Sequence, residues 1–206
     1  MRYLYIDTSS NFLYSAIIED EKLLVEIKEK LEQELSKLAL PRIAEMFDKV
    51  NLKAKDIDKI IVVNGPGSFT GIRIGLTIAK VYAWSLNIPI TQITSLEAMS
   101  ASSNEKKYHV PIINARKGYV YGAIYDENQN EILKPTYIEL SELELKIKNI
   151  SDYEIIKNDE SLEGTNNYDP NFLKIISHFK NKENTSPHLI NPEYLKLTEA
   201  EKSKLW

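Results

Sequence analysis

The first part of the chain alternates between short apolar runs and polar breaks. Apolar runs lie at Tyr3–Ile6, Phe12–Ile18 and Lys22–Ile27, and polar turns separate them. Runs of this length between turn residues are typical of strands. We therefore expect three consecutive strands joined as a meander.

The spacing of apolar positions changes over Leu31–Val50, where they fall on about half of a helical wheel. Pro41 falls on the polar side, where a kink leaves the apolar face intact. We expect a helix here, followed by a buried strand over Ile57–Val63, which is rich in β-branched residues. A glycine-rich turn then leads into a second helix that runs to about Leu86, and Asn87 suits its C-terminal end.

The second half carries a shorter and less regular pattern. A strand is expected to begin at Ile88–Ile90 and a short helix to start at Ser95–Met99. The small and polar segment 101–107 is suited to a linker between lobes. Residues 140–185 have a weaker pattern, and 192–205 predict a closing helix with a proline in its first turn. Three further strands are expected at Val110–Asn114, Tyr119–Tyr125 and Ile132–Ile138.

Composition narrows the classes of function. The chain has 206 residues, no cysteine and a formal net charge of -4. Without cysteine there is no thiol nucleophile, thiolate metal site or disulfide, and the negative charge argues against a free-standing nucleic-acid-binding module. The apolar runs are too short to span a membrane and no secretory signal is visible, so we expect a cytoplasmic protein.

The histidines do not suggest a metal site. The chain has His109, His178 and His188, and none has metal-ligand spacing. We expect neither a metal nor a cofactor. A Ser-His-Asp arrangement stays open, because its members need not be neighbours in sequence.

The turn between the expected strand and the second helix reads Asn-Gly-Pro-Gly-Ser-Phe-Thr-Gly over 64–71. It lacks the lysine of a Walker A loop and the spacing of a dinucleotide fingerprint. The helix start could bind an anion through its free N–H groups, but we favour a structural role in which the glycines permit a tight turn. The end of the first strand, at Asp7, resembles the first phosphate loop of actin-like kinases. The candidate phosphate or structural residues are Asp7, Thr8, Ser9, Gly65, Gly67 and Ser68.

The second helix has two apolar faces and a row of small residues, Gly71, Gly75, Ala79 and Ala83, spaced by four. Such a row forms a groove for the ridges of another helix. Covering a sheet needs only one apolar face, so the other face requires a neighbour, which is either the Leu31–Val50 helix or another chain. The candidate partner-contact residues are Leu35, Leu38, Ile43, Gly71, Ile74, Gly75, Ile78, Ala79 and Tyr82.

Residues 64–80 resemble the signature of the TsaB (YeaZ) family. Shorter matches occur in the family's order along most of the chain. They are Ile6–Ser9, Ser95–Ala98, Ala115–Arg116 with Val120–Tyr121, and Pro192–Lys196.

The resemblance implies an α/β protein with the actin-like (ASKHA, ribonuclease H-like) fold, in which each of two lobes has a mixed sheet and helices. We place the lobes at 1–100 and 101–206, and the terminal helix could return to the first lobe. The implied function is a non-catalytic subunit for threonylcarbamoyl transfer to adenosine 37 of tRNAs that read ANN codons. The implied partners are a TsaD-like transferase and a TsaE-like ATPase, and tRNA is met only through the complex. The oligomeric state of the chain alone stays open, since the same apolar helix face could pair with itself in a homodimer.

Two departures from the family pattern remove ionisable groups. Leu35-Ser36 stands where the family usually has His-Ser, and Asn114-Ala115-Arg116 stands where it usually has Asp-Ala-Arg. Both departures disfavour a peptidase activity. The alternative function is a nucleotide-dependent enzyme that uses Asp7, or a glycoprotease-like hydrolase of the same fold.

Overall fold

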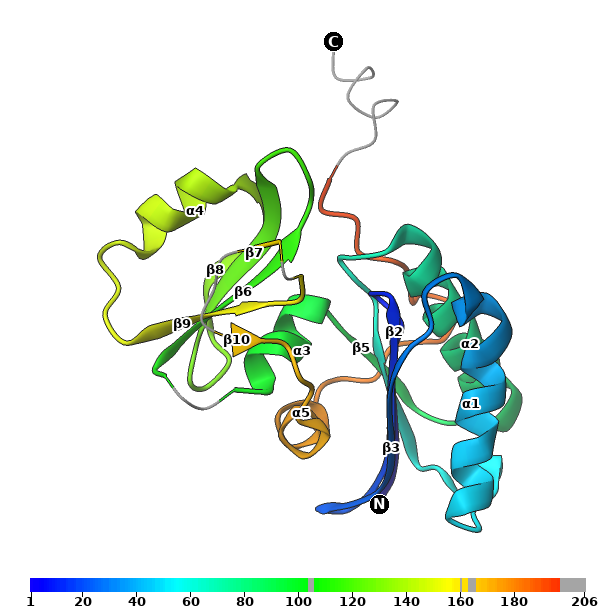
Figure 1. Cartoon of the computed structure of the whole chain (residues 1–206). Coiled ribbons are helices and arrows are strands. Elements are labelled where there is room, and N and C mark those ends of the chain that lie inside the picture. Colours follow the sequence, from blue (N-terminus) through cyan, green and yellow to red (C-terminus); the bar gives the residue numbers. More distant parts are fainter. Residues whose placement is uncertain (104–105, 160, 163–165, 197–206) are drawn as a thin grey trace.

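The computed structural model describes residues 1–103, 106–159, 161–162 and 166–196. They form two lobes, each built on a five-stranded sheet (Figure 1). The first sheet has the order β3-β2-β1-β4-β5. Its strands are β1 (Arg2–Asp7), β2 (Phe12–Glu19), β3 (Lys22–Lys30), β4 (Lys59–Val63) and β5 (Ile90–Ile93).

The first sheet is mixed, and its central strands are buried on both faces. β1 pairs with β2 antiparallel, with Tyr5 opposite Ala16, and with β4 parallel, with Tyr5 opposite Ile61. From Tyr3 to Asp7 every residue of β1 is buried, which requires a covering layer on each side of the sheet. β3 lies at the edge, and its exposed positions are charged. The predicted meander of three strands is confirmed.

The second sheet repeats this topology. Its order is β10-β9-β6-β7-β8, so its first strand again pairs antiparallel with the second and parallel with the fourth. Two lobes with the same mixed sheet are what the actin-like fold requires, and the fold class is confirmed. The strands are β6 (Tyr108–Asn114), β7 (Tyr119–Asp126), β8 (Glu131–Glu139), β9 (Tyr153–Lys157) and β10 (Asn166–Asn167).

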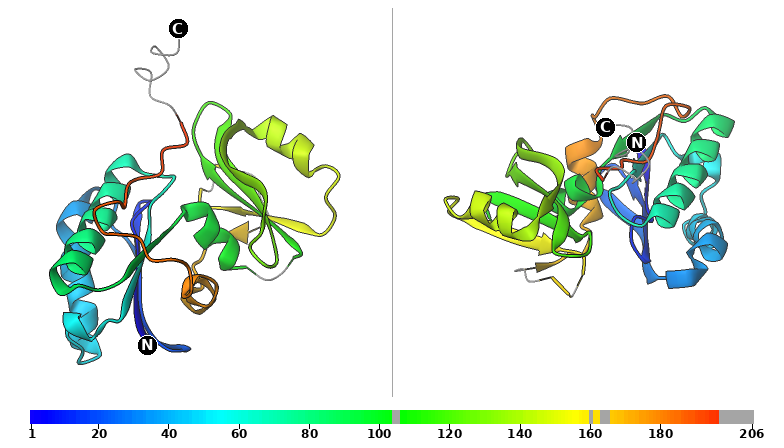
Figure 2. Two further views of the ribbon diagram at one scale, coloured as in Figure 1. Left: turned by 180° about the vertical axis from the view of Figure 1, so that it is seen from behind. Right: turned by 90° about the horizontal axis from the view of Figure 1, so that it is seen from above.

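Helices and sheets alternate in five layers (Figures 1 and 2). α1 and α2 cover the outer face of the first sheet, α3 and α5 lie between the two sheets, and α4 covers the outer face of the second. The helices are α1 (Leu35–Lys49), α2 (Phe69–Leu86), α3 (Ser95–Ala101), α4 (Leu140–Ile147) and α5 (Phe172–Phe179), with 3-10 turns at Glu32–Glu34 and Ala54–Asp56.

Local signals in the sequence set the helix ends. The Ser68 side chain accepts a hydrogen bond from the Gly71 N–H at 3.2 Å and so begins α2. Asn87 ends α2 in the left-handed conformation with φ 54°, as predicted. Thr94 and Glu97 form a capping box at the start of α3.

The C-terminal part of the chain returns to the first lobe earlier than expected. α5 packs on the first sheet, where the Phe172 ring lies 5.4 Å from that of Tyr5. Further on, Ile190 is buried in the core beneath α2. Of the described residues, α5 and Ile190 therefore pack with the first lobe. The helix predicted over 192–205 is wrong for residues 192–196, which are not helical, and its remainder lies outside the described residues.

Candidate functional site

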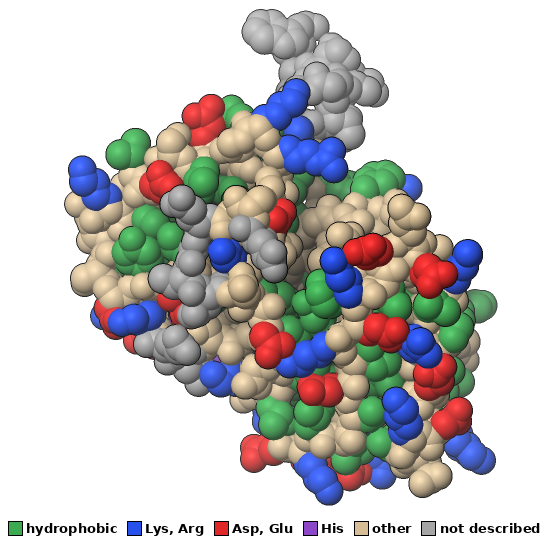
Figure 3. All heavy atoms as spheres, in the orientation of Figure 1, with side chains coloured by type: hydrophobic (Ala, Val, Ile, Leu, Met, Phe, Trp, Pro, Cys, Tyr) green, Lys and Arg blue, Asp and Glu red, His purple; other side chains and the backbone are tan. Residues whose placement is uncertain are grey.

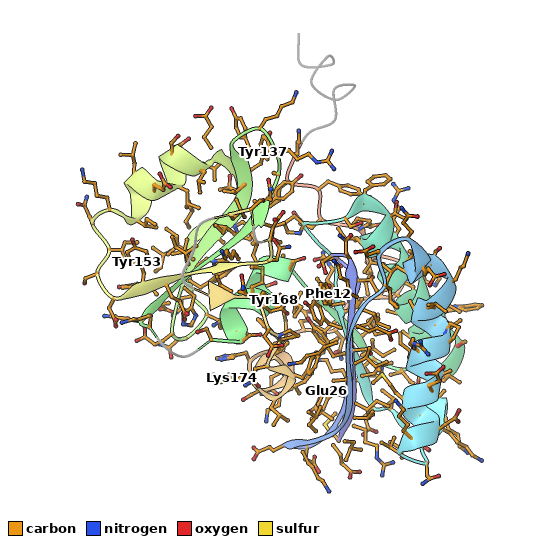
Figure 4. All side chains as sticks on the ribbon, viewed as in Figure 1. Phe12, Glu26, Tyr137, Tyr153, Tyr168 and Lys174 are labelled. Carbon is orange, nitrogen blue, oxygen red and sulfur yellow. The ribbon has the colours of Figure 1, made fainter. Side chains whose placement is uncertain are left out.

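A cleft of about 990 Å³ lies between the two lobes. Loops from the C-terminal ends of strands in both sheets line it, where an α/β sheet commonly places a ligand site. Phe12 and Tyr168 both line it and lie close together in Figure 4, and each ring contacts that of Tyr14. Its cationic side chains are Lys30, Arg116 and Lys157.

Asp7 lies at the base of the cleft and is only 2% exposed. Its carboxylate accepts hydrogen bonds from the Ser9 N–H at 2.8 Å and from the Tyr5 hydroxyl at 3.4 Å. Burial raises the pKa of Asp7 against the opposing effect of these hydrogen bonds. Among the described residues, hydrogen bonds from Ser9 and Tyr5 therefore hold the carboxylate, and no ion pair is seen there.

The candidate phosphate loops are bonded to each other. The Ser68 N–H donates to the Ser9 carbonyl at 2.7 Å, and the Thr8 hydroxyl donates to the Gly71 carbonyl at 2.7 Å. A Cβ at Gly67 would overlap the Ser9 carbonyl, and a Cβ at Gly71 would overlap the Thr8 carbonyl. These glycines let the backbone of the turn approach the end of β1, and part of the donor set at the start of α2 is already used within the chain.

On the second lobe, Asn114 occupies the position at which the family pattern has an acid. Its side-chain amide donates to Asp159 at 3.2 Å and to Ser161 at 3.0 Å, and its oxygen accepts from the Arg116 N–H at 2.8 Å. The Ser161 N–H is the main cause of the lowered pKa of Asp159. Asn114 therefore organises this wall of the cleft through its neutral side chain.

A serine, a histidine and a carboxylate do come together away from the cleft. Ser100 Oγ lies 3.1 Å from His109 Nδ1, and Glu154 Oε1 lies 3.7 Å from His109 Nε2, which is also 3.0 Å from the Lys106 carbonyl. Ser100, His109 and Glu154 are each at most 2% exposed, so a substrate cannot reach them in this conformation. The cluster joins α3 to the second sheet.

The structure divides the nine candidate partner-contact residues into two groups. Those half-buried between or beside α1 and α2 are Leu38, Ile74, Ile78 and Tyr82. Those buried in the core of the first lobe are Leu35, Ile43, Gly71, Gly75 and Ala79.

The buried group corrects our interpretation of the small-residue row. The row faces the chain's own first sheet, with Gly75 against Thr8 and Ile6, so it is not an open groove for another helix. The other apolar face of α2, which carries Ile74 and Ile78, packs on α1. The ring centroids of Phe47 on α1 and Tyr82 on α2 are 6.2 Å apart.

Exposed apolar side chains on the same two helices escaped the sequence analysis. They are Leu40 at 59%, Phe69 at 56%, Val81 at 58%, Trp84 at 66% and Leu86 at 40% exposure. Figure 3 shows the α1 side of this face, where apolar patches lie among acidic and basic side chains. Large exposed apolar side chains that lie together on one face are typical of protein interaction sites.

The described residues show neither a metal site nor a membrane-spanning helix. No group of three or more histidine, aspartate or glutamate side chains there is arranged to hold a metal ion. Within the same ranges, no helix is both long and apolar enough to cross a membrane.

Comparison with known proteins identifies the family. The family model for TsaD, tRNA N6-adenosine threonylcarbamoyltransferase, matches residues 27–201. The tRNA threonylcarbamoyladenosine biosynthesis protein TsaB of Bacillus subtilis (strain 168) is 31% identical over 98% of this chain and 96% of its own. The protein of the same name from Buchnera aphidicola subsp. Acyrthosiphon pisum is 34% identical over 70% of this chain and 66% of its own.

Solved structures agree on the fold. A Pseudomonas aeruginosa protein described as similar to peptidase YEAZ superposes with a TM-score of 0.79 at 17% identity, over 95% of this chain and 99% of its own. YeaZ from Pseudomonas aeruginosa gives a TM-score of 0.73 at 18% identity, over 94% of this chain and 99% of its own. Sequence and fold thus point to the same group of proteins, and this chain belongs to the TsaB (YeaZ) family, whose members are named for tRNA threonylcarbamoyladenosine biosynthesis.

Proposed function

We propose that this chain is a non-catalytic subunit that binds a TsaD-like transferase through the outer face of α1 and α2. In the resulting cytoplasmic assembly, the transferase modifies adenosine 37 of tRNAs that read ANN codons. A TsaE-like ATPase joins the assembly, and tRNA is bound by the assembly rather than by the free chain. When the chain is alone, a second copy could cover the same helix face.

The exposed apolar face of α1 and α2 carries this proposal. Trp84 and Val81 are more than half exposed on a helix whose opposite side is fully buried. Tryptophan is enriched among the residues that dominate binding energy at protein interfaces, and covering such a face with another protein removes its apolar surface from water. The match to a transferase family model suggests a related chain as the partner.

The absence of a catalytic role is supported by how the candidate groups are used. The first loop is bonded to the start of α2, and the amide of Asn114 holds Asp159 and Ser161. The buried Ser100 and His109 have no access to substrate. These candidate groups are therefore engaged in contacts that hold the fold together.

Depletion of the protein in its own cell tests the proposed role. Threonylcarbamoyladenosine in bulk tRNA should disappear, as measured by nucleoside mass spectrometry, and the gene for the wild-type chain should restore it. A variant with Val81→Glu and Trp84→Glu should fold but restore little. Unchanged modification after depletion would contradict the required role.

A second candidate is a hydrolase or nucleotide-dependent enzyme that uses the cleft. Asp7 and Asp159 both line it, and their pKa values are shifted in opposite directions, as in acid/base pairs. Turnover of ATP or of a peptide by highly purified chain, abolished by Asp7→Ala, would favour this candidate over the subunit role.

A further inference from the structure

The turn between β6 and β7 holds two cations in an unusual backbone conformation. Arg116 and Lys117 both have positive φ, 67° and 55°, and Gly118 follows at 78°. Positions of this kind favour glycine, asparagine or aspartate. The chain instead has two long cationic side chains there, both exposed. Residues held against their backbone preference often mark a functional surface.

Two tyrosines stand directly beside this turn. Tyr119 and Tyr137 are stacked with ring centroids 4.7 Å apart and planes 8° from parallel, and Tyr121 leans on Tyr137 at 5.7 Å. The Tyr119 hydroxyl donates to Glu139 at 2.8 Å, which fixes the stack. Among the described residues, Tyr119 and Tyr137 belong to none of the four apolar cores, so core packing does not account for them.

The C-terminal segment brings a third cation to this place. Lys196 Nζ lies 5.1 Å from the centre of the Tyr137 ring. The same segment carries Tyr194, whose ring stacks on Phe69 at 5.5 Å and whose hydroxyl accepts from Arg73 Nε at 3.0 Å. Aromatic and cationic side chains from both lobes therefore meet at one end of the cleft. Figure 4 shows Tyr137 at that end, and Figure 3 shows Lys and Arg side chains gathered there.

We propose that the cleft-mouth surface, formed by Arg116, Lys117, Tyr119, Tyr137 and Lys196, contacts unpaired nucleotides of the RNA substrate. Tyr119 and Tyr137 are partly exposed. Tyrosine rings at a surface stack on nucleobases of any sequence, and cations beside them neutralise phosphates. The negative net charge of the whole chain does not prevent this, because a local group of cations sets the field that a bound phosphate meets. Acidic side chains also lie near this surface, among them Glu139, which accepts from Tyr119, and Glu142, whose charge also acts on Tyr119.

This inference rests on the assembly proposed above, in which tRNA is the substrate. It concerns a different surface from the outer face of α1 and α2, so the two proposals can fail separately. The contact is one contribution to RNA binding by the assembly, and the free chain should show it only weakly, at low ionic strength.

The test measures the affinity of a labelled, unmodified tRNA transcript for the full chain at low ionic strength and for its assembly with the transferase subunit. Tyr137→Ala should weaken binding about tenfold in both, because a base–aromatic stack is lost. Tyr137→Phe keeps the ring and should bind like the wild type. Melting temperatures and affinity for the transferase should stay unchanged in each variant.

The cations are tested through the salt dependence of binding. Arg116→Gln with Lys117→Gln should lower the slope of log affinity against log salt by about 1 to 1.5, the value for two lost contacts to single-stranded phosphates. Lys146→Gln with Lys148→Gln, which neutralises two exposed lysines at the end of α4, is the matched control and should leave the slope unchanged. Glu139→Gln keeps an acceptor for Tyr119 and should tighten binding two- to threefold.

The possible results show whether RNA or another molecule contacts the cleft-mouth surface. RNA affinities within twofold of the wild type for Tyr137→Ala and for the double cation variant would overturn the proposal. So would variants that lose affinity for the transferase but not for RNA, because they would show a protein contact instead. Failure of the wild-type chains to assemble would refute the proposed subunit role, while the measurement on the free chain would still decide the RNA contact.

Discussion

The Thr8 hydroxyl donates a hydrogen bond to the Gly71 carbonyl at 2.7 Å, which ties the end of β1 to the first turn of α2. One turn further along, a Cβ at Gly75 would overlap the same hydroxyl oxygen and approach Ile6. The row of small residues on α2 therefore exists to let this helix lie close to its own sheet. It also fixes which side of α2 is left for other proteins.

Gly75→Ala should destabilise the protein. The added methyl displaces Thr8 and weakens its hydrogen bond, at a cost of about 1–3 kcal/mol, and this exceeds the gain of up to about 1 kcal/mol from better helix propensity. A melting temperature lower by several degrees is expected. Thr8→Ala in the same chain should recover part of the loss, because the atom in the way is removed.

Thr77→Ala, at an exposed position of the same helix, is the control and should change the melting temperature little. Ala79→Leu should also lower the melting temperature, since Ala79 is fully buried. Its folded fraction should still bind the transferase normally. Strong loss of partner affinity in a stable Ala79→Leu variant would contradict the orientation of α2.

Asp7→Asn should raise the melting temperature at neutral pH. The pKa of Asp7 is raised in the folded protein, so its stabilising contribution is complete below the unfolded value of about 3.8 and is lost as the pH rises through the folded value. An amide keeps the acceptor for the Ser9 N–H without the buried charge. The difference between variant and wild type should shrink as the pH is lowered toward 4.

The matched comparison is Asp159→Asn. The pKa of Asp159 is lowered in the folded protein, so this substitution should lower the melting temperature at neutral pH. If the chain is not catalytic, Asp7→Asn should also support tRNA modification in depleted cells like the wild type. A stable Asp7→Asn protein that fails to do so would assign Asp7 a chemical role.

His109 should make the protein less stable in mild acid. Burial lowers its pKa more than Glu154 and the Lys106 carbonyl raise it, with Lys174 adding to the lowering and Glu127 opposing it. Neutral His109 therefore contributes its full stabilisation above pH about 6.5, and this is lost as the pH falls from there through the folded-state pKa. Thermal unfolding between pH 7 and pH 5 measures this loss.

His109→Gln should flatten the pH dependence of the melting temperature, even if the variant is less stable at every pH. His178→Gln, at an exposed position on α5, should change it less. An equal slope in wild type and His109→Gln would show that other groups control the acid response.

The fold was largely predictable because short sequence patterns mark most helices and strands of both lobes. The burial of β1 and β4 follows from their β-branched and apolar runs, and Asn87 and the glycine turn mark the ends of α2. The return of α5 to the first lobe was not predictable. Its apolar face would suit either sheet, and only the three-dimensional path of the chain decides between them.

The candidate sites were predicted less well, for a related reason. Periodicity shows that α2 has two apolar faces, but it does not say which neighbour covers each of them. The row of small residues on α2 was predicted to contact a partner. Small residues are needed there because Thr8 lies directly against Gly75. The stack of Tyr119 and Tyr137 depends on the register of β8 against β7. That register shifts between Gly122 and Tyr125, and the sequence does not announce the shift.

The most direct test of the proposed function is the affinity of the full chain for the transferase subunit. Calorimetry measures it for a double variant on α2 and for a single variant on α4. Val81→Glu with Trp84→Glu places charge on the outer face of α2, while Leu145→Glu places it at a side chain of equal exposure, 67%, on α4. We predict a loss of affinity of tenfold or more, about 1.4 kcal/mol or more, for the α2 variant. The α4 variant should bind normally, and both should melt near the wild-type temperature. Wild-type affinity in a folded α2 variant would contradict the account.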